Sequence, residues 1–236
     1  MARGSEMGRF WDERAAENAL YFIDNNASYE DTDEERFWAG GRTTLDKFLE
    51  LSGVDLPAGG VAVEIGCGVG RLTRPLAERT AFVHAVDVSE RMLALARDRH
   101  AELENVEWIH GDGTSLAGVG DGVADVCISQ IVFQHIPDPA ITLGYVREIG
   151  RVLADGGVAG FQVSNDPKIH AMPFRERMKM KLRRHGPRGQ GDAPWLGSAV
   201  ELDDLRTAAA EGGMDIENVY GEGTQFCLVR TRRLPR

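Results

Sequence analysis

The glycine-rich stretch Val61–Gly70, with the sequence VAVEIGCGVG, constrains the fold more than any other part of the chain. Its apolar run predicts a buried strand, and the residues from Arg71 onward predict a helix. Gly66, Gly68 and Gly70 have no Cβ, so the chain can turn sharply and a ligand can lie against the amides at the helix N-terminus. The stretch therefore predicts a strand, a ligand-binding turn and a helix in succession.

Three later apolar runs also end in polar residues. The run 81–87 ends at Asp87, about 20 residues after the first glycine, where a carboxylate can accept hydrogen bonds from both hydroxyls of a ribose. The run 106–113 ends in Gly-Asp-Gly, and the run 124–130 ends at Gln130. Strands alternate with helices from residue 61 to residue 164, which predicts a mainly parallel sheet with right-handed crossovers.

The spacing G-x-G-x-G, with Glu64 two residues before the first glycine, resembles motif I of the class I S-adenosylmethionine (SAM) methyltransferases and differs from the G-x-G-x-x-G dinucleotide fingerprint. The later strand ends match the family's motifs in order over residues 61–164. The resemblance implies an α/β fold with a doubly wound, seven-stranded, mainly parallel sheet of the Rossmann-like methyltransferase type. N-terminal capping helices and a C-terminal antiparallel hairpin, at 214–220 and 225–230, would complete it. The alternative is an α/β domain whose acids only cap helices and whose glycines only turn.

The resemblance also implies a cofactor, SAM, with S-adenosylhomocysteine (SAH) as the product. It assigns Asp87 to the ribose and Asp112 to the adenine amino group. Arg42, at the border of an apolar helical stripe, would need an anion and could bind the methionyl carboxylate, unless it is an ordinary surface arginine. The complete predicted cofactor set is Glu64, Gly66, Cys67, Gly68, Gly70, Asp87, Val88, Met92, Gly111, Asp112, Gly113, Gln130 and Arg42.

Two parts are expected along the chain: an N-terminal helical cap at 1–55 and a SAM-binding domain at 56–236, with a basic, lid-like insertion at 167–197. The second cap helix should begin with a capping box at 32–35. The resemblance implies that both cap helices lie over the carboxyl edge of the sheet, although aromatic residues of this kind are more often core packing than substrate contacts. The predicted substrate-binding residues are Trp11, Tyr21, Phe22, Trp38 and His135.

The insertion is strongly basic. Residues 167–189 hold eight Lys or Arg against one Glu, in a chain of net charge −10. Phe174, Met178 and Leu182 would share one helical face. We consider three interpretations: a solvated lid helix, a docking surface for an anionic substrate or acidic carrier protein, and a membrane-surface helix.

Composition narrows the partners. The net charge of −10 argues against nucleic acid, and no apolar run is long enough to span a bilayer. The N-terminus lacks the apolar core of a signal peptide, so we expect a cytoplasmic protein, monomeric or homodimeric, that acts on a small molecule. The three cysteines are far apart and have no histidine partner at ligand spacing, so no metal site is predicted.

Methyl transfer mainly requires alignment of nucleophile, methyl and sulfur in a dry pocket. A base is needed only if the nucleophile is a hydroxyl, and His135 is the candidate, with an orienting or structural role as the alternative. The predicted function is SAM-dependent methylation of a small molecule on oxygen, with nitrogen or carbon as other acceptors and natural-product biosynthesis as one setting. A SAM-fold protein that does not methylate, such as a cyclase or pericyclase, is the second class; a regulatory SAM-binding module is the third.

Overall fold

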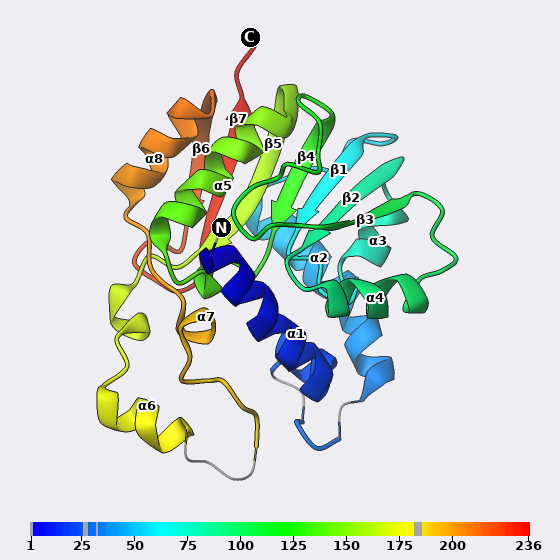
Figure 1. Cartoon of the computed structure of the whole chain (residues 1–236). Helices are drawn as coiled ribbons and strands as arrows, with labels where there is room; N and C mark the ends of the chain where they lie inside the picture. Colours follow the sequence, from blue (N-terminus) through cyan, green and yellow to red (C-terminus); the bar gives the residue numbers. More distant parts are fainter. Residues whose placement is uncertain (1, 26–27, 32, 182–185) are drawn as a thin grey trace.

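The computed structural model describes residues 2–236 apart from 26–27, 32 and 182–185 (Figure 1). One seven-stranded sheet has the order β3-β2-β1-β4-β5-β7-β6. Strands β1 to β5 pair in parallel, and β7 is antiparallel to both of its neighbours. The strands are β1 Val61–Ile65, β2 Phe82–Asp87, β3 Val106–His110, β4 Ala124–Ser129, β5 Leu153–Val163, β6 Met214–Tyr220 and β7 Cys227–Arg233.

Helices cover both faces of this sheet. The helices of the described chain are α1 Ala2–Ile23, α2 Glu34–Ser52, α3 Thr73–Ala77, α4 Glu90–Arg99, α5 Pro139–Val152, α6 Phe174–Lys181, α7 Ala193–Leu196 and α8 Leu202–Glu211. Two 3-10 turns are η1 Phe133–His135 and η2 Pro167–His170. Ser89 caps α4 and Asp138 caps α5, each through its side chain. The doubly wound α/β sheet and its closing antiparallel hairpin confirm the predicted fold class.

Two cores flank the sheet. On one face, α5 and α8 bury Val146, Ile149 and Leu205 against β4, β5 and β7. On the other, α2, α3 and α4 bury Leu45, Leu76, Leu93 and their neighbours against β1 and β2. The alternation of helix and strand thus produces two apolar layers and leaves the carboxyl ends of the parallel strands free to form a site.

The prediction that both N-terminal helices lie over the carboxyl edge was wrong for α2. Helix α1 runs along that edge, in front of the strand ends (Figure 1). Helix α2 reaches the edge only at its first turn, near Phe37, and then buries Leu45 and Phe48 in the core on the face of the sheet. An apolar stripe on a helix predicts that it packs against another part of the protein but does not identify that part. For α2 the partner is the face of the sheet.

The start of α2 differs from expectation by one residue. The N-cap of α2 is Asp33, whose carboxylate accepts from the Arg36 amide at 2.9 Å, and Thr32 of the predicted capping box lies outside the described residues. Strand β5 begins at Leu153, and its pairing with β4 is irregular between Ala124 and Val126. In the insertion, Met178 of the predicted apolar face is 40% exposed. The other two residues of that face cannot be compared, because Leu182 and the side chain of Phe174 lie outside what the structure describes.

Candidate active site

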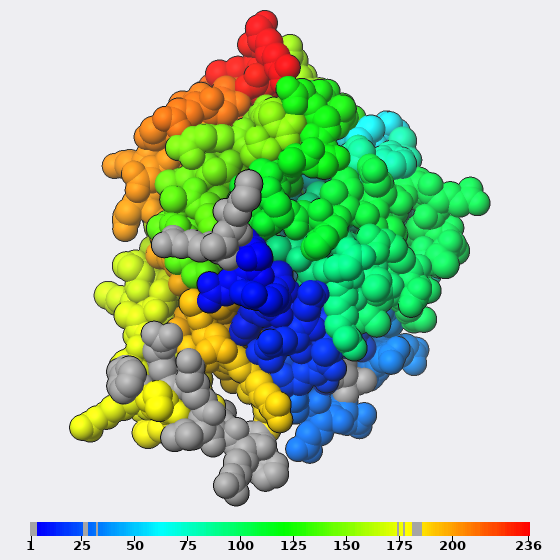
Figure 2. Space-filling view, viewed as in Figure 1, coloured from blue at the N-terminus to red at the C-terminus, as the bar shows by residue number. Residues whose placement is uncertain are grey.

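A cavity opens where the carboxyl ends of β1, β2, β3 and β4 meet beneath α1. Eight of the predicted cofactor residues line it: Gly66, Gly68, Asp87, Val88, Met92, Gly111, Gly113 and Gln130. Met7, Trp11, Phe22 and Ile23 of α1 close one side, and Ile131, Val132, His135, Ile136 and Tyr145 form the other. Figure 2 shows α1 across this face of the molecule, between the loops that follow the strands and the insertion. The position at the strand ends is the usual ligand site of such sheets.

The glycine turn is fixed to the neighbouring strand. The amides of Gly66 and Cys67 donate to the Val86 carbonyl at 2.7 and 3.1 Å. Gly66 and Gly68 have φ values of +76° and +54°, a region that other residues rarely adopt. Gly70 is also left-handed, but a Cβ there would lie 2.7 Å from the His100 ring, so this glycine is required for packing and does not line the cavity.

Asp87 lies at the end of β2 with its carboxylate beside the turn. Its Oδ2 accepts from the Gly68 amide and its Oδ1 from the Ser89 amide, both at 2.8 Å. Burial raises the pKa of Asp87, and the hydrogen bonds from the amides of Ser89, Gly68 and Val88 oppose that rise. A desolvated carboxylate with two bonds already made has lone pairs left for ligand hydroxyls.

Glu64 and Cys67 do not line the cavity. Glu64 is 3% exposed and accepts a hydrogen bond from the Thr73 hydroxyl at 2.6 Å. This bond joins the end of β1 to the start of α3 and therefore fixes the two ends of the glycine turn to each other. Cys67 is buried, and burial raises the pKa of its thiol well above the ordinary value.

Asp112 begins the loop between β3 and β4 and is exposed, whereas the glycines on either side of it line the cavity. Its carboxylate accepts from the amides of Thr114 and Ser115, both at 2.7 Å, and from the Ser115 hydroxyl at 2.9 Å. These hydrogen bonds outweigh desolvation and lower the pKa of Asp112. Asp112 is therefore the cap of its own loop.

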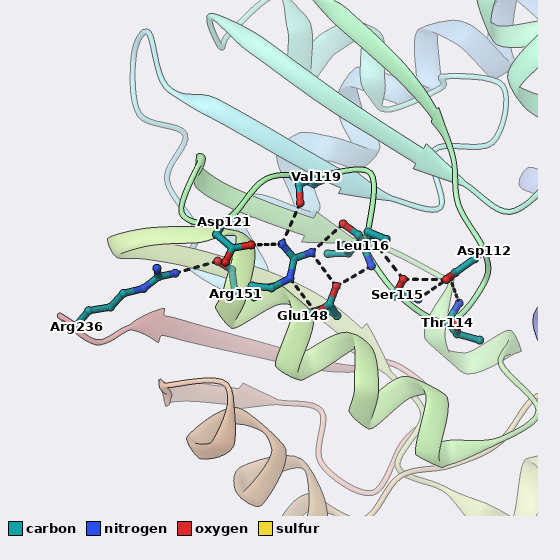
Figure 3. A network of polar contacts seen from close by, with 10 residues as sticks. Asp112, Thr114, Ser115, Leu116, Val119, Asp121, Glu148, Arg151 and Arg236 are labelled. Carbon is teal, nitrogen blue, oxygen red and sulfur yellow. Dashed lines mark hydrogen bonds and ion pairs between the residues drawn. The ribbon is translucent and has the colours of Figure 1, made fainter. Parts of the chain in front are cut away.

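Helix α5 holds the rest of that loop (Figure 3). Arg151 donates to the carbonyls of Leu116 and Val119 at 2.9 and 3.0 Å, and Glu148 accepts from the Leu116 amide at 3.0 Å. An ion pair of 2.8 Å joins Arg151 to Glu148. The backbone after Asp112 is thereby fixed to the sheet's own helix layer.

The end of β4 carries two signs of a binding site. The side-chain Oε1 of Gln130 is buried and has no hydrogen-bond partner among the residues that the structure describes, although the residue lines the cavity. Ile131 follows with φ of 55°, and it is the one non-glycine residue with positive φ in the described part of the chain. A β-branched residue in this conformation is strained, and such strain gathers at ligand sites.

His135 stands on the cavity wall with its ring orientation fixed. Its Nδ1 lies 2.9 Å from the Trp195 carbonyl of α7, and its Nε2 lies 3.3 Å from the Gln134 side-chain amide. Because a carbonyl only accepts, Nδ1 carries the proton, and the Nε2 lone pair accepts from the Gln134 side-chain NH2. Burial lowers the pKa of His135 to about 4, so the imidazole is neutral near pH 7.

Three predicted residues lie away from the cavity. Arg42 is exposed and forms an ion pair with Glu78, so its anion is a protein carboxylate, and the structure supports the surface-arginine alternative over a role in binding the methionyl carboxylate. Trp38 packs edge-on against His100 at 5.1 Å, on the far side of the glycine turn. Tyr21 contacts Phe22 and Tyr29 and does not line the cavity. Trp11 and Phe22 do line it.

The sequence interpretation missed Tyr145, Trp195 and Arg71. Tyr145 lines the cavity from α5, a helix in which no site residue was predicted. Trp195 holds His135 and packs 5.7 Å from Phe22, across a sequence separation that no local pattern encodes. Arg71 could have been suspected, since a charged residue directly after a glycine turn needs a partner.

The cavity fits SAM on the evidence of its own groups. A desolvated carboxylate at the end of β2, an orphaned buried amide oxygen at the end of β4 and a left-handed glycine turn match a ligand with hydroxyl and ammonium donors. A family model described as "Methyltransferase domain" matches residues 63–161. A ubiquinone biosynthesis O-methyltransferase from Methylococcus capsulatus is 30% identical over 167 residues, which are 70% of this chain and 68% of that protein.

The chain belongs to the class I SAM-dependent methyltransferases. SAM is the cofactor of this methyltransferase. A second ubiquinone biosynthesis O-methyltransferase, from Ruegeria pomeroyi, is 35% identical over 168 residues, 70% of this chain and 65% of that protein.

Solved structures agree on the fold of the methyltransferase. The N-methyltransferase NodS from Bradyrhizobium japonicum in complex with SAH has a TM-score of 0.61 at 18% identity, over 96% of this chain and 98% of that one. A SAM-dependent methyltransferase from Mesorhizobium loti has a TM-score of 0.59 at 21% identity, over 80% of this chain and all of that one. In the described part of the methyltransferase, no helix is long and apolar enough to cross a membrane, and no three His, Cys, Asp or Glu side chains group as metal ligands.

Proposed function

We propose that this methyltransferase methylates a hydroxyl group of a small molecule in the cytoplasm, with His135 as the base. The observation that carries the proposal is the fixed tautomer of His135 on the cavity wall. Its Nδ1–H donates to the Trp195 carbonyl, and its Nε2 accepts a long bond of 3.3 Å from the Gln134 amide, which an acceptor hydroxyl would replace. Two similar proteins are named O-methyltransferases, which supports oxygen as the acceptor atom. Three buried free thiols suit a reducing compartment.

The chain's residues would divide the work as follows. Asp87 would accept from the ribose, and Asp112 from the adenine amino group. Gln130 Oε1 would accept from a donor of the cofactor or acceptor. When bound, SAM supplies a methyl group on a sulfonium whose sulfur leaves without a proton.

The acceptor would lie among apolar and aromatic groups. Trp11, Phe22, Ile131 and Val132 line this part of the cavity, and Asp87 is the one charged side chain among the described lining residues. Such a wall excludes water and suits an acceptor whose reacting end is uncharged. An anionic or carrier-bound portion of the acceptor would lie outside the cavity, toward the basic insertion.

A base with a pKa near 4 is adequate for this step. A hydroxyl becomes strongly acidic as its oxygen forms a bond to carbon, so a neutral imidazole at hydrogen-bond distance can take the proton during the transfer. Because His135 is neutral above its pKa of about 4, we expect kcat/KM to be flat near pH 7 and to fall only in acid.

Two substitutions separate the base role from an orienting role. The asparagine of His135→Asn, unlike the alanine of His135→Ala, can place an N–H near the Trp195 carbonyl, but neither side chain can accept the proton. If His135 is the base, both variants should lose about 10² to 10⁴ in kcat while SAH affinity changes little. Turnover of SAM to SAH with a panel of phenols, alcohols and amines measures this. Near-normal kcat in His135→Asn would reject the base role, and turnover of amines alone would reject oxygen.

A further inference from the structure

Arg71, the residue directly after the glycine turn, connects three segments of the chain. Its Nη2 donates to Asp24 Oδ2 at 2.8 Å, immediately after α1. Its Nε donates to the Phe37 carbonyl at 3.1 Å, in the first turn of α2, and its guanidinium lies 5.0 Å from the centroid of the Phe37 ring. The Arg71 side chain is only 13% exposed. One cation thus joins the cofactor turn to both N-terminal helices.

Helix α2 is shaped to accept this residue. A Cβ at Gly41 would overlap the Arg71 carbonyl oxygen, and a Cβ at Gly40 would lie 2.9 Å from Arg71 Nη2. The two glycines therefore let the backbone and the guanidinium of Arg71 rest directly on the helix. The arginine supplies the hydrogen bonds and the two glycines of α2 supply the space for it, so the contact is packed and largely buried, unlike an exposed ion pair.

The end of α1 that Arg71 holds carries two of the four α1 residues that line the cavity. Helix α1 bends at Asn18, whose φ of −164° and ψ of 87° are not helical. Beyond the bend, Phe22 and Ile23 line the cavity. Ile23 rests on the turn itself, since a Cβ at Gly68 would lie 2.9 Å from its Cδ1.

We propose that Arg71 is a positioning residue that couples closure of α1 over the cavity to the cofactor-binding shape of the glycine turn. Arg71 does not line the cavity and acts through Asp24 and Phe37. When the turn is shaped for the cofactor, Arg71 reaches both partners and α1 closes. By thermodynamic reciprocity, cofactor binding and α1 closure then favour each other. The inference rests on the cofactor site and is independent of the acceptor and of His135.

The test uses SAH, which binds without turnover, on the full chain. Calorimetry gives SAH affinity, and amide hydrogen exchange of residues 10–23 reports closure of α1. In the wild type, SAH should slow exchange in this segment. In Arg71→Met, SAH should bind at least about fivefold more weakly and should no longer slow exchange in α1. Arg71→Lys should recover part of both, because an ammonium can reach Asp24 but cannot also replace the guanidinium bond to Phe37.

A matched control is Arg79→Met. Arg79 pairs with Asp46 at 2.6 Å and joins α2 to the segment after α3, away from the cavity. This variant should keep wild-type SAH affinity and the protection of α1. If Arg71→Met does not fold, Asp24→Asn, which leaves the arginine in place, should show the same loss of SAH-dependent protection.

Two outcomes would overturn the proposal. One is wild-type SAH affinity with protected α1 in Arg71→Met or Asp24→Asn. The other is an equal loss in Arg79→Met, which would indicate general destabilisation. Neither readout involves methyl transfer, so failure here is distinguishable from failure of the O-methylation proposal.

Discussion

Glu64 is a buried carboxyl group, and its desolvation in the folded protein disfavours the ionised form. Burial raises its pKa from 4.5 to about 7, against the hydrogen bond from the Thr73 hydroxyl, which lowers it. Between these two pKa values the folded state binds more protons than the unfolded state. The free energy of unfolding is therefore highest below pH 4.5 with respect to this group and falls as the pH rises to 7.

Glu64→Gln should remove this pH dependence. Between pH 4.5 and 7 the wild type should lose about 3 kcal/mol through Glu64, since each unit of pKa difference corresponds to about 1.4 kcal/mol. The glutamine keeps an oxygen for the Thr73 hydroxyl and carries no charge. Urea unfolding of both proteins at pH 5 and pH 8 measures the effect. A difference between variant and wild type that is the same at both pH values would contradict it.

For Asp87 the predicted pH dependence concerns SAH affinity and has the opposite sign. A ligand that donates to this carboxylate favours its ionised form, so SAH affinity should fall as the pH drops through the pKa of Asp87, which burial raises. Asp87→Asn should bind SAH about 1.5 to 3 kcal/mol more weakly, with a flat pH profile in that range. Calorimetry from pH 4 to pH 8 is the measurement, and unchanged affinity in Asp87→Asn would remove Asp87 from the site.

At the scale of elements, the strands were predictable and the contacts between distant segments were not. Buried parallel strands are continuous apolar runs that end in polar residues, so β1 to β4 and the residues at their carboxyl ends could be recognised locally. Periodicity found the buried face of α2 but could not say that the sheet covers it. The partner of Arg42 and the docking of α7 depend on tertiary contacts, for which the sequence carries no local pattern.

Helix α7 shows how such a contact sets a candidate catalytic residue. Gly197, at the end of α7, has φ of +62°, and a Cβ there would overlap the Gln134 carbonyl oxygen and lie 2.9 Å from His135 Cα. The Ser198 hydroxyl donates to the Ile136 carbonyl at 2.7 Å. The close approach of α7 to η1 therefore buries His135 and keeps its pKa low.

Gly197→Ala should push α7 away from η1 and expose the imidazole. The pKa of His135 should then rise from about 4 toward its ordinary 6.5, as an NMR titration of the ring protons would show. Gly59→Ala is the matched control, because Gly59 also has positive φ, at +73°, but has no atom within 4 Å of its Cβ position. A pKa near 4 in Gly197→Ala would mean that α7 does not govern the burial of His135.

On the scale of the whole molecule, positive charge is concentrated in the insertion and the rest of the chain is net negative. Residues 167–189 carry net +7 in a chain of net −10, while the described cavity lining holds no lysine or arginine. Lys168, Arg175 and Lys179 are exposed in this segment, and Lys179 pairs only with the neighbouring Glu176, at 3.1 Å, among the described residues. Arg183 and Arg184 lie outside the described residues. The insertion is thus the place where an anionic part of the acceptor, or an acidic carrier, would be attracted.

This division predicts a salt-dependent KM for the acceptor with little change in kcat. Attraction between exposed charges weakens as the Debye length shortens from about 10 Å at 0.1 M salt to about 3 Å at 1 M, so the acceptor KM should rise over that range. Lys168→Glu with Arg175→Glu should raise KM at low salt and flatten its salt dependence. Arg206→Glu, a charge reversal at an exposed site on α8, should do neither. A wild-type KM that is independent of salt would leave the insertion as a solvated lid, because a surface that recognises charge cannot be indifferent to screening.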